Sequence, residues 1–585
     1  MTFRSRSPLA AVAFAALAAC APQPSAGPAS APAGASRVAP ADLVLRGGAV
    51  YTLDAIRSWA HAVAVRDGRI LYVGSDEGAA PFVGEATRVV ELGGRMVLPG
   101  LQDAHIHPIS GGLRAIQCEL GGLRTQEEYL KAVADYAAAH PEAAWIRGGG
   151  WVMDAFPGGI PDGRALDEIL PDRPVYLRST DGHSAWVNSK ALEIAGITAE
   201  TPDPPDGRID RDPATGEPVG ALQEGAMSLV QRHAPPDSLA ERVAGLRHAL
   251  RMLNGYGITA FQDAAAGTPG GMSVDDALET YRYLDARGEL TARVVAAQWW
   301  YRDRGDEQIA EMIERRARYT HGRLRATSVK IMQDGVMENF TAVLNEPYLG
   351  KPGVTGIPML DPERLKQIVA KLDREGFQVH FHAIGDGAIR QSLDAVEVAR
   401  KANGDRGNRH HISHIQLFHP ADIPRFRELD VVANFQPLWA FADAYITELT
   451  IPFLGPERSR WMYPIASLQS SGAILAFGSD WSVSSANPFE EIEVAVTRMG
   501  ALGETSTPYL PEERIDLGSA IAAFTTGSAY VNSLERETGS IEVGKRADLV
   551  VLDRNLFAVP PTEISGTRVL LTLLDGEPVH GDLSL

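Results

Sequence analysis

The chain has 585 residues, of which 45% are hydrophobic and 22% are charged, and its formal net charge is −19. A chain of this length is too long to fold around one small hydrophobic core, so we expect several substructures or one large barrel with additions. The excess of acidic residues argues against nucleic acid as a partner and fits a soluble protein that binds cations.

The first twenty residues have the pattern of an export signal. Arg4 and Arg6 precede a short apolar run over residues 8–19, which cannot cross a bilayer because a spanning helix needs about twenty residues. The run ends in Leu17-Ala-Ala-Cys20, which resembles the lipobox of bacterial lipoproteins. The resemblance implies a lipoprotein signal peptide over residues 1–20 with lipidation at Cys20. The alternative is an ordinary signal peptide in which this cysteine is incidental.

The segment after this cysteine is expected to be a tether. Residues 21–40 are rich in Ala, Pro and Ser, a composition typical of a disordered linker. Ala21 follows the cysteine where Asp could stand, which resembles the default for sorting to the outer membrane in Gram-negative bacteria. We therefore expect an exported protein that is lipid-anchored to the bacterial envelope, at the outer membrane facing the periplasm, and that meets the membrane only through this anchor.

Short β-rich segments occupy both ends of the remaining chain. Asp67-Gly68 and Asp575-Gly576 are dipeptides typical of tight hairpin turns. The apolar runs near them are Val44–Tyr51, Ala62–Val65, Ile70–Val73, Ala547–Leu552 and Val569–Leu574. Because this pattern returns only at the far end, we predict one small β-sandwich assembled from residues 41–95 and residues 536–585.

Residues 96–535 alternate apolar strands with helical segments. Asp361 and Asn487 each precede a proline, which is typical of a capped helix start. The predicted strands are Met96–His107, Ile258–Asp263, Thr291–Trp299, Thr327–Gln333, Phe377–Ala383, His411–Gln416, Val431–Gln436 and Ala473–Asp480. Eight such units predict an α/β fold, a (β/α)8 TIM-type barrel whose chemistry lies at the C-terminal ends of its strands. A doubly wound sheet is the alternative.

The gap between the first two barrel strands is long enough to hold elements of its own. Thr125 and Glu128 have the spacing of a capping box at the start of a helix over residues 125–140. Residues 145–151 and 175–178 are further candidate strands. We predict an insertion over about residues 113–235 that lies above the barrel mouth.

Polar residues that can hold a metal recur at the ends of the predicted barrel strands. They are His105, His107, Lys330, His382, His414 and Asp480. Lys330 stands among Val329, Ile331 and Met332, where a buried cation is costly unless it is paired or neutralised. Histidines, a lysine and an aspartate that converge on one barrel mouth offset each other's burial if metal cations lie between them.

These residues lie in motifs that resemble the amidohydrolase superfamily, in particular the branch of the N-substituted formamide deformylases. The resemblance covers nearly the whole chain after residue 40. The motifs are Leu98-Pro-Gly-Leu-Gln-Asp-Ala-His-Ile-His107, Asp181-Gly-His-Ser-Ala-Trp-Val-Asn-Ser189, Val329-Lys-Ile-Met-Gln-Asp-Gly335, His382-Ala-Ile-Gly-Asp386, Gly478-Ser-Asp480 and Gly539-Ser-Ile-Glu-Val-Gly-Lys-Arg-Ala-Asp-Leu-Val-Val-Leu552.

The resemblance implies a role for each metal-site residue. Three side chains would hold one divalent ion: His105, His107 and Asp480. His382 and His414 would hold a second ion, and Lys330, carboxylated by carbon dioxide, would bridge the two. The expected metal is zinc, with one or two ions per chain, and the same nitrogen and oxygen ligands also suit Mn, Ni or Fe. Asp480 would also act as the catalytic base, taking a proton from water and passing it to the leaving amine.

Four further residues are candidate substrate contacts: His183, Trp186, Glu224 and Asp386. For His183 and Trp186 the alternative is packing of the insertion against the barrel, and Asp386 could instead support a loop. His380 shares a strand face with His382 and is expected to support the ligands. Aromatic residues on the predicted mouth loops favour an apolar substrate.

The resemblance and the residues together predict a metal-dependent hydrolase that cleaves a C–N bond in an amide or a cyclic amide. A deaminase or an ester hydrolase on the same scaffold is the first alternative, and a noncatalytic, surface-anchored binding protein is the second. The expected partners are a small-molecule substrate and a second copy of the chain in a possible homo-oligomer, with no nucleic acid.

Overall fold

A computed structural model describes residues 39–268 and 271–585. The predicted signal peptide, the lipidation site Cys20 and nearly all of the predicted tether lie outside the described residues. Within the described residues, no helix is both long and apolar enough to cross a membrane.

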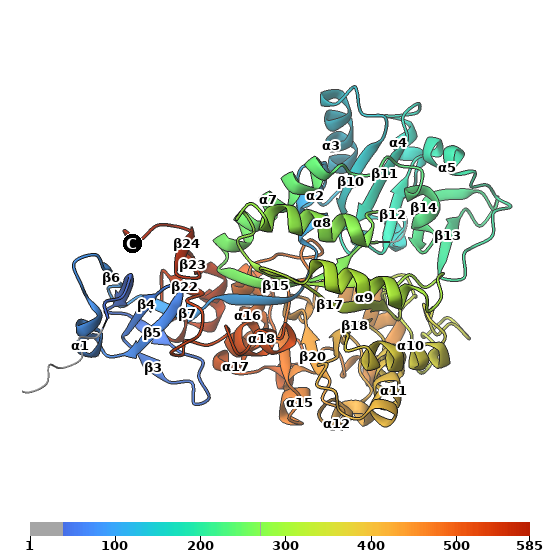
Figure 1. The fold of residues 1–585 in the computed structure, drawn as a ribbon. Coiled ribbons are helices and arrows are strands. Elements are labelled where there is room, and N and C mark those ends of the chain that lie inside the picture. Colours follow the sequence, from blue (N-terminus) through green and yellow to red (C-terminus); the bar gives the residue numbers. More distant parts are fainter. Residues whose placement is uncertain (1–38, 269–270) are drawn as a thin grey trace, which may run out of the picture. The chain divides into compact units, whose positions relative to one another are not determined.

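Eight parallel strands form the central sheet, as predicted (Figure 1). They are β8 (Leu101–Ile106), β15 (Ile258–Ala266), β16 (Arg293–Trp299), β17 (Leu324–Met332), β18 (Gln378–Ala383), β19 (His411–His414), β20 (Val432–Phe435) and β21 (Leu475–Phe477). The sheet closes onto β8 where Asp480 N, after β21, donates to His105 O at 2.7 Å and Asn434 Nδ2, in β20, donates to Ala104 O at 3.0 Å. The sheet is therefore a nearly closed (β/α)8 TIM-type barrel, and the prediction of this fold is confirmed.

Helices follow the barrel strands in turn and lie outside them (Figure 1). They are α7 (Leu239–Gly255), α8 (Val274–Asp285), α9 (Gln308–Tyr319), α10 (Pro362–Arg374), α11 (Asp386–Asn403), α12 (Ile423–Glu428), α15 (Ile465–Ser470) and α16 (Pro488–Thr497). The Asp361 and Asn487 side chains accept hydrogen bonds from backbone N–H groups in the first turns of α10 and α16, as their positions before proline predicted.

The predicted first strand, Met96–His107, is two strands that belong to different sheets. Met96–Pro99 forms β7 in a terminal sheet, and β8 begins at Leu101 in the barrel. Gly100 separates them, and a Cβ at this position would fall 2.2 Å from Thr259 Oγ1. We predicted one strand because the flanking residues are apolar, although Pro99-Gly100 is a dipeptide typical of turns and the break lies at this pair.

Both ends of the described chain build a β-sandwich. One sheet has the order β5-β4-β1-β6 and the other has the order β24-β23-β22-β7-β2-β3. Their strands are β1 (Leu43–Arg46), β2 (Ala49–Tyr51), β3 (Trp59–Ala60), β4 (Ala62–Arg66), β5 (Arg69–Gly74), β6 (Arg88–Glu91), β22 (Leu549–Leu552), β23 (Val569–Leu574) and β24 (Glu577–His580). Side chains of both sheets, such as Leu45 and Val551, share one buried cluster. The predicted hairpins at Asp67-Gly68 and Asp575-Gly576 are present.

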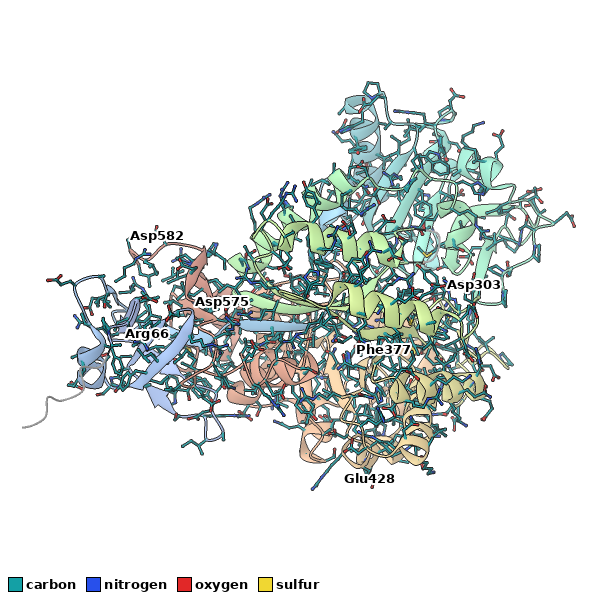
Figure 2. The ribbon with its side chains drawn as sticks, in the orientation of Figure 1. Arg66, Asp303, Phe377, Glu428, Asp575 and Asp582 are labelled. Atoms are coloured by element: carbon teal, nitrogen blue, oxygen red, sulfur yellow. The ribbon has the colours of Figure 1, made fainter. Side chains whose placement is uncertain are left out.

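Ion pairs connect the sandwich to the start of the barrel. Arg293, at the beginning of β16, donates to both Asp548 oxygens at 2.8 and 3.0 Å and to Asp575 Oδ1 at 2.6 Å. Asp575 also accepts from Arg323 at 2.9 Å, and Figure 2 marks its place beside the barrel. This network lies at the end of the barrel away from the metal-site residues, so it supports the fold rather than the chemistry.

The long segment after β8 forms a separate sheet, as an insertion predicts. Its strands are β9 (Cys118–Glu119), β10 (Ile146–Trp151), β11 (Val175–Ser179), β12 (Ser184–Val187), β13 (Gly207–Arg211) and β14 (Pro218–Glu224). Helix α2 (Pro108–Arg114) leads into it, and helix α3 (Gln126–Ala139) begins at the predicted capping box of Thr125 and Glu128. The insertion has its own buried cluster, which includes Trp151 and Trp186.

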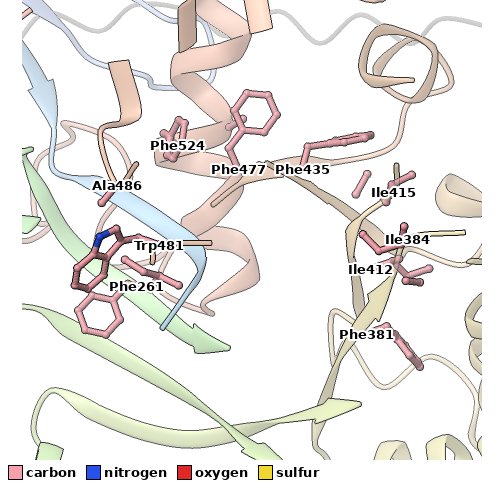
Figure 3. Packing of buried hydrophobic residues seen from close by; sticks show 14 of the residues in the cluster. Phe261, Phe381, Ile384, Ile412, Ile415, Phe435, Phe477, Trp481, Ala486 and Phe524 are labelled. Atoms are coloured by element: carbon pink, nitrogen blue, oxygen red, sulfur yellow. The ribbon is translucent and has the colours of Figure 1, made fainter. Parts of the chain in front are cut away.

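The two faces of the barrel strands differ in polarity. Apolar side chains at alternate positions pack in one cluster with the surrounding helices, among them Phe261, Phe381, Ile412, Phe435 and Phe477 (Figure 3). The other face points inward and is polar: Gln262 Oε1 contacts His380 Nδ1 at 2.7 Å and His411 Nε2 at 3.0 Å. Histidine side chains therefore point into the barrel interior, below the candidate metal-site residues at the barrel mouth.

Candidate active site

The structure brings all six predicted metal-site residues to one cavity. His105, Lys330 and His382 lie near the ends of β8, β17 and β18, and His414 ends β19. His107 and Asp480 follow β8 and β21. All six line a cavity of about 650 Å³ between the barrel mouth and the insertion. The strand order explains this convergence, because C-terminal ends of parallel strands meet at one edge.

Three of these side chains form a compact set of possible ligands. The Oδ1 atom of Asp480 lies 2.9 Å from His107 Nε2 and 3.5 Å from His105 Nε2. One ligand atom from each of the three residues lies within 4.8 Å of the others. Two imidazole nitrogens and a carboxylate oxygen at this spacing are a donor set that suits zinc and similar divalent ions.

His414 extends the set and shows why a cation fits here. Its Nδ1 lies 4.0 Å from Asp480 Oδ2, and its ring lies 4.5 Å from the ring of His382. Both ring nitrogens are buried, and neither has a hydrogen-bond partner among the described residues. Burial lowers the pKa of His414 to about 3, so its imidazole is neutral and can donate a lone pair. A buried imidazole with two unpartnered nitrogens is costly unless a ligand engages one of them.

Neighbouring groups orient the histidines toward the cavity. His380 Nε2 and His105 Nδ1 are 2.9 Å apart, which leaves His105 Nε2 for the cavity side. His382 Nδ1 lies 3.2 Å from Asp334 Oδ1, and Asp334 also accepts hydrogen bonds from three backbone N–H groups. Metal-ligating histidines commonly bond their second nitrogen in this way. The supporting place expected for His380 agrees with this geometry, whereas the role of Asp334 was not anticipated.

Burial and neighbouring charges set the protonation states of Asp480 and Lys330. Burial would raise the pKa of Asp480, but the hydrogen bond and charge of His107 outweigh it, so the pKa is lowered and the side chain is a carboxylate. Lys330 is buried with Nζ at 3.4 Å from His105 Nε2. Burial lowers the pKa of Lys330 to about 7 against the opposing charges of Asp480 and Asp263. At neutral pH the ε-amine of Lys330 is therefore close to losing its proton.

Two of the four candidate substrate contacts line the cavity as a pair. His183 Nδ1 lies 3.0 Å from both carboxylate oxygens of Glu224, and Thr341 Oγ1 donates to Glu224 Oε1 at 2.8 Å. Burial would lower the pKa of His183, but the charge and hydrogen bond of Glu224 outweigh it and raise this pKa to about 9. The His183 ring lies 5.2 Å from the ring of His382, so the pair stands beside the metal-site residues.

The other two candidates do not line this cavity, so their predicted role as substrate contacts is corrected. Trp186 is fully buried in the core of the insertion, where its Nε1 donates to Asp162 O at 3.0 Å. The carboxylate of Asp386 accepts hydrogen bonds from Asn345 N at 3.0 Å and Asn345 Nδ2 at 2.7 Å. Asp386 therefore anchors the loop after β17, which was the alternative for this residue.

The aromatic residues expected at the mouth do not form the cavity wall. Trp151 and Phe156 lie in the insertion core, and Phe340 packs against Tyr348 and Phe453. Arginines are prominent among the cavity-lining side chains instead: Arg114, Arg147, Arg178, Arg232 and Arg302. The cavity wall is mixed, because Tyr176, Trp299 and several methionines also line it, and the expected aromatic residues do not supply its apolar part. No motif marked these arginines, because they come from separate segments of the insertion and the barrel.

Comparisons with known proteins agree with this architecture. A sequence model of the amidohydrolase family matches residues 88–580. The chain is 35% identical over 547 residues to the protein LONG AFTER FAR-RED 3 of Arabidopsis thaliana, covering 92% of each chain. It is 28% identical over 558 residues to the N-substituted formamide deformylase of Arthrobacter pascens, covering 92% of this chain and 97% of that enzyme.

Solved structures are also similar to this chain in fold. The structure of an uncharacterized metal-dependent hydrolase from Pyrococcus horikoshii is similar with a TM-score of 0.70 at 25% identity, covering 89% of this chain and 99% of the other. A zinc-bound adenosine deaminase from Xanthomonas campestris has a TM-score of 0.51 at 16% identity, covering 94% of each chain. The second likeness concerns the fold alone.

Proposed function

This chain belongs to the amidohydrolase family, and we propose that it hydrolyses a carbon–nitrogen bond, in an amide or a cyclic amide, at the barrel mouth. Metal-dependent hydrolysis is the general chemistry of the family and of its structural neighbours. The observation that carries the proposal is the convergence of His105, His107 and Asp480 next to His414, whose buried nitrogens have no partner among the described residues.

The residues present fit one or two divalent ions, with zinc as the expected metal. His105, His107 and Asp480 would hold one ion, and His382 and His414 would hold a second. Lys330 would join the two after carboxylation by carbon dioxide, which turns a buried cation into an oxygen donor. A divalent ion bound here supplies Lewis acidity, which acidifies water and polarises a carbonyl group.

The side chains of this protein perform the proton transfers in the proposal. The carboxylate of Asp480 accepts a proton from the attacking water and returns it to the leaving nitrogen. His183, held as a cation by Glu224, places a positive donor where the carbonyl oxygen gains negative charge. The walls of the cavity keep the reacting groups close together.

The proposal that the cleaved bond is an amide rests on similar proteins of known name rather than on the geometry of the site. The N-substituted formamide deformylase of Arthrobacter pascens matches this chain almost end to end, and its name describes removal of a formyl group from an amide nitrogen. Deamination and ester hydrolysis would use the same machinery, so they are alternative outcomes of the same test.

A substrate screen with metal-depleted and zinc-loaded protein tests the proposal. We expect zinc-loaded protein to release an amine from N-formyl or N-acyl compounds, or to open a lactam to its amino acid, and we expect metal-depleted protein to be inactive. Activity confined to esters or to amino-heterocycles would replace the amide assignment by one of its alternatives. Activity that survives complete metal removal would contradict the proposal as a whole.

We also propose that residues 1–20 are a lipoprotein signal peptide and that Cys20 is acylated, which would anchor the enzyme to the outer membrane. The support is the Leu17-Ala-Ala-Cys20 sequence and the basic residues before it. Metabolic labelling with radioactive palmitate in a Gram-negative host tests this. We expect the label on wild-type protein and none on Cys20→Ser, whereas persistent labelling of Cys20→Ser would refute the anchor.

A further inference from the structure

The insertion contributes to the cavity an arginine without an acidic partner. Arg178 lies in β11 and lines the cavity. Its Nη2 donates to the carbonyl oxygen of Gly182 at 3.2 Å, and no carboxylate of the described residues forms an ion pair with it. A guanidinium has five N–H donors in a rigid fork. Most of the donors of Arg178 are therefore available to a ligand.

The other arginines around the cavity are already paired or lie in solvent. Arg147 forms an ion pair with Asp237 at 2.9 Å, and Arg302 pairs with Asp206. Arg232 is exposed at the rim. Among the described arginines that line the cavity, Arg178 is consequently the buried-side guanidinium without a paired carboxylate, and the Asp181 carboxylate, which also lines the cavity, contacts Ser179 and His183 N rather than Arg178.

Arg114 adds a second donor next to this charge. It ends α2, the seven-residue helix that begins directly after His107, so it lies about 10 Å along the helix axis from that ligand. Arg114 Nε lies 3.4 Å from Glu119 Oε2, yet this buried nitrogen has no hydrogen-bond partner among the described residues. Glu119 balances the charge of Arg114 but leaves a donor unsatisfied, which favours an acceptor supplied by a ligand.

The position of Arg178 connects it to the reaction centre. Gly182, which accepts its hydrogen bond, directly precedes His183, and the His183 ring lies 5.2 Å from the ring of His382. Arg178 and His183 therefore belong to one β11–β12 hairpin that faces the metal-site residues. A cavity of about 650 Å³ can hold a small molecule that reaches from the centre to this hairpin.

We propose that Arg178, assisted by Arg114, binds the carboxylate of an anionic substrate whose scissile amide lies at the metal centre. The proposal rests on the proposed function for the position of the amide. One unbalanced guanidinium matches a singly charged carboxylate better than a doubly charged phosphate, and its fork can bind both oxygens at once. The substrate class that follows from the proposal is an N-acyl or N-formyl amino acid rather than a neutral apolar amide.

A matched pair of substrates tests this inference with the zinc-loaded enzyme. N-formyl-4-aminobenzoate carries a carboxylate, and N-formyl-4-aminobenzamide has the same shape without the charge. We expect kcat/KM for the anionic compound to be higher by about tenfold or more, as a charge-assisted hydrogen bond provides. Arg178→Gln should abolish this preference, Arg178→Lys should restore part of it, and Arg232→Gln should retain it as a control for the general field.

Direct binding separates this inference from the proposed hydrolysis. Calorimetry with 4-aminobenzoate needs no turnover, and we expect Arg178→Gln to weaken binding about tenfold while Arg232→Gln does not. If neither substrate is hydrolysed but this difference in binding is seen, the amide assignment fails and the carboxylate site stands. Equal kcat/KM for the two compounds in the wild type, or undiminished preference and binding in Arg178→Gln, would overturn the inference.

Discussion

Replacing Glu224 by Gln should change how the stability of the metal-free protein depends on pH. His183 Nδ1 lies 3.0 Å from both Glu224 oxygens, and Glu224 overcomes the effect of burial to raise the pKa of His183 from 6.5 to about 9. Each pKa unit corresponds to about 1.4 kcal/mol, so the protonated pair contributes about 3 kcal/mol to the free energy of unfolding. In Glu224→Gln the raised pKa, and with it this contribution, should be lost.

The direction of the pH effect follows from the raised pKa. The folded protein holds a proton on His183 that the unfolded chain releases above pH 6.5. The stabilisation is therefore complete below pH 6.5 and is lost as the pH rises through about 9. Between these values the stability of the wild type should fall more steeply with pH than that of Glu224→Gln.

Urea unfolding of metal-free protein at several pH values measures this difference. The midpoint and slope give the free energy of unfolding at each pH. Thr341→Val is the matched control, because it removes the hydrogen bond from Thr341 Oγ1 to Glu224 while it keeps both charges of the pair. Its pH dependence should follow the wild type. An identical pH dependence in wild type and Glu224→Gln would refute the reasoning.

Three further substitutions test other parts of the site. Asp480→Asn should lower kcat by about 100- to 10,000-fold, as loss of a general base does, with little change in KM; an unchanged kcat in steady-state assays would remove Asp480 from catalysis. His380→Ala should weaken metal affinity about 10- to 100-fold because His105 loses its orienting partner, and competition with a chelator would show no such change if His380 were only packing. Trp186→Ala should cost about 3–5 kcal/mol of stability with KM unchanged; a raised KM in a stable variant would return Trp186 to the substrate site.

The barrel and its metal-site residues could be predicted because their signals are local. Each strand is a short apolar run, and each ligand lies near or just after the C-terminal end of its run, where barrel chemistry lies. His105, Lys330 and Asp480 are also difficult to explain as core residues, since burial of their polar groups needs a partner. In the structure these residues lie together, where they can be partners for one another.

The features that were missed depend on segments distant in the sequence. The break at Gly100 has a local signal in Pro99-Gly100 that the prediction did not use, whereas the approach of Thr259 that requires glycine there could not be read from the sequence. Trp186 was placed at the substrate because it lies in the insertion near His183, yet it packs in the core of that insertion. Arg178 lines the same cavity as the metal-site residues only because the β11–β12 hairpin folds over the barrel.

The central claim is that the barrel mouth holds a metal on which hydrolysis depends, and a zinc titration of metal-depleted protein tests it most directly. Bound zinc and amidase activity are followed together in the wild type and in Lys330→Ala. We predict that one or two equivalents of zinc restore activity to the wild type in step with binding, and that Lys330→Ala loses zinc and activity together. Full zinc binding with full activity in Lys330→Ala, or activity in the wild type before zinc is added, would contradict the account.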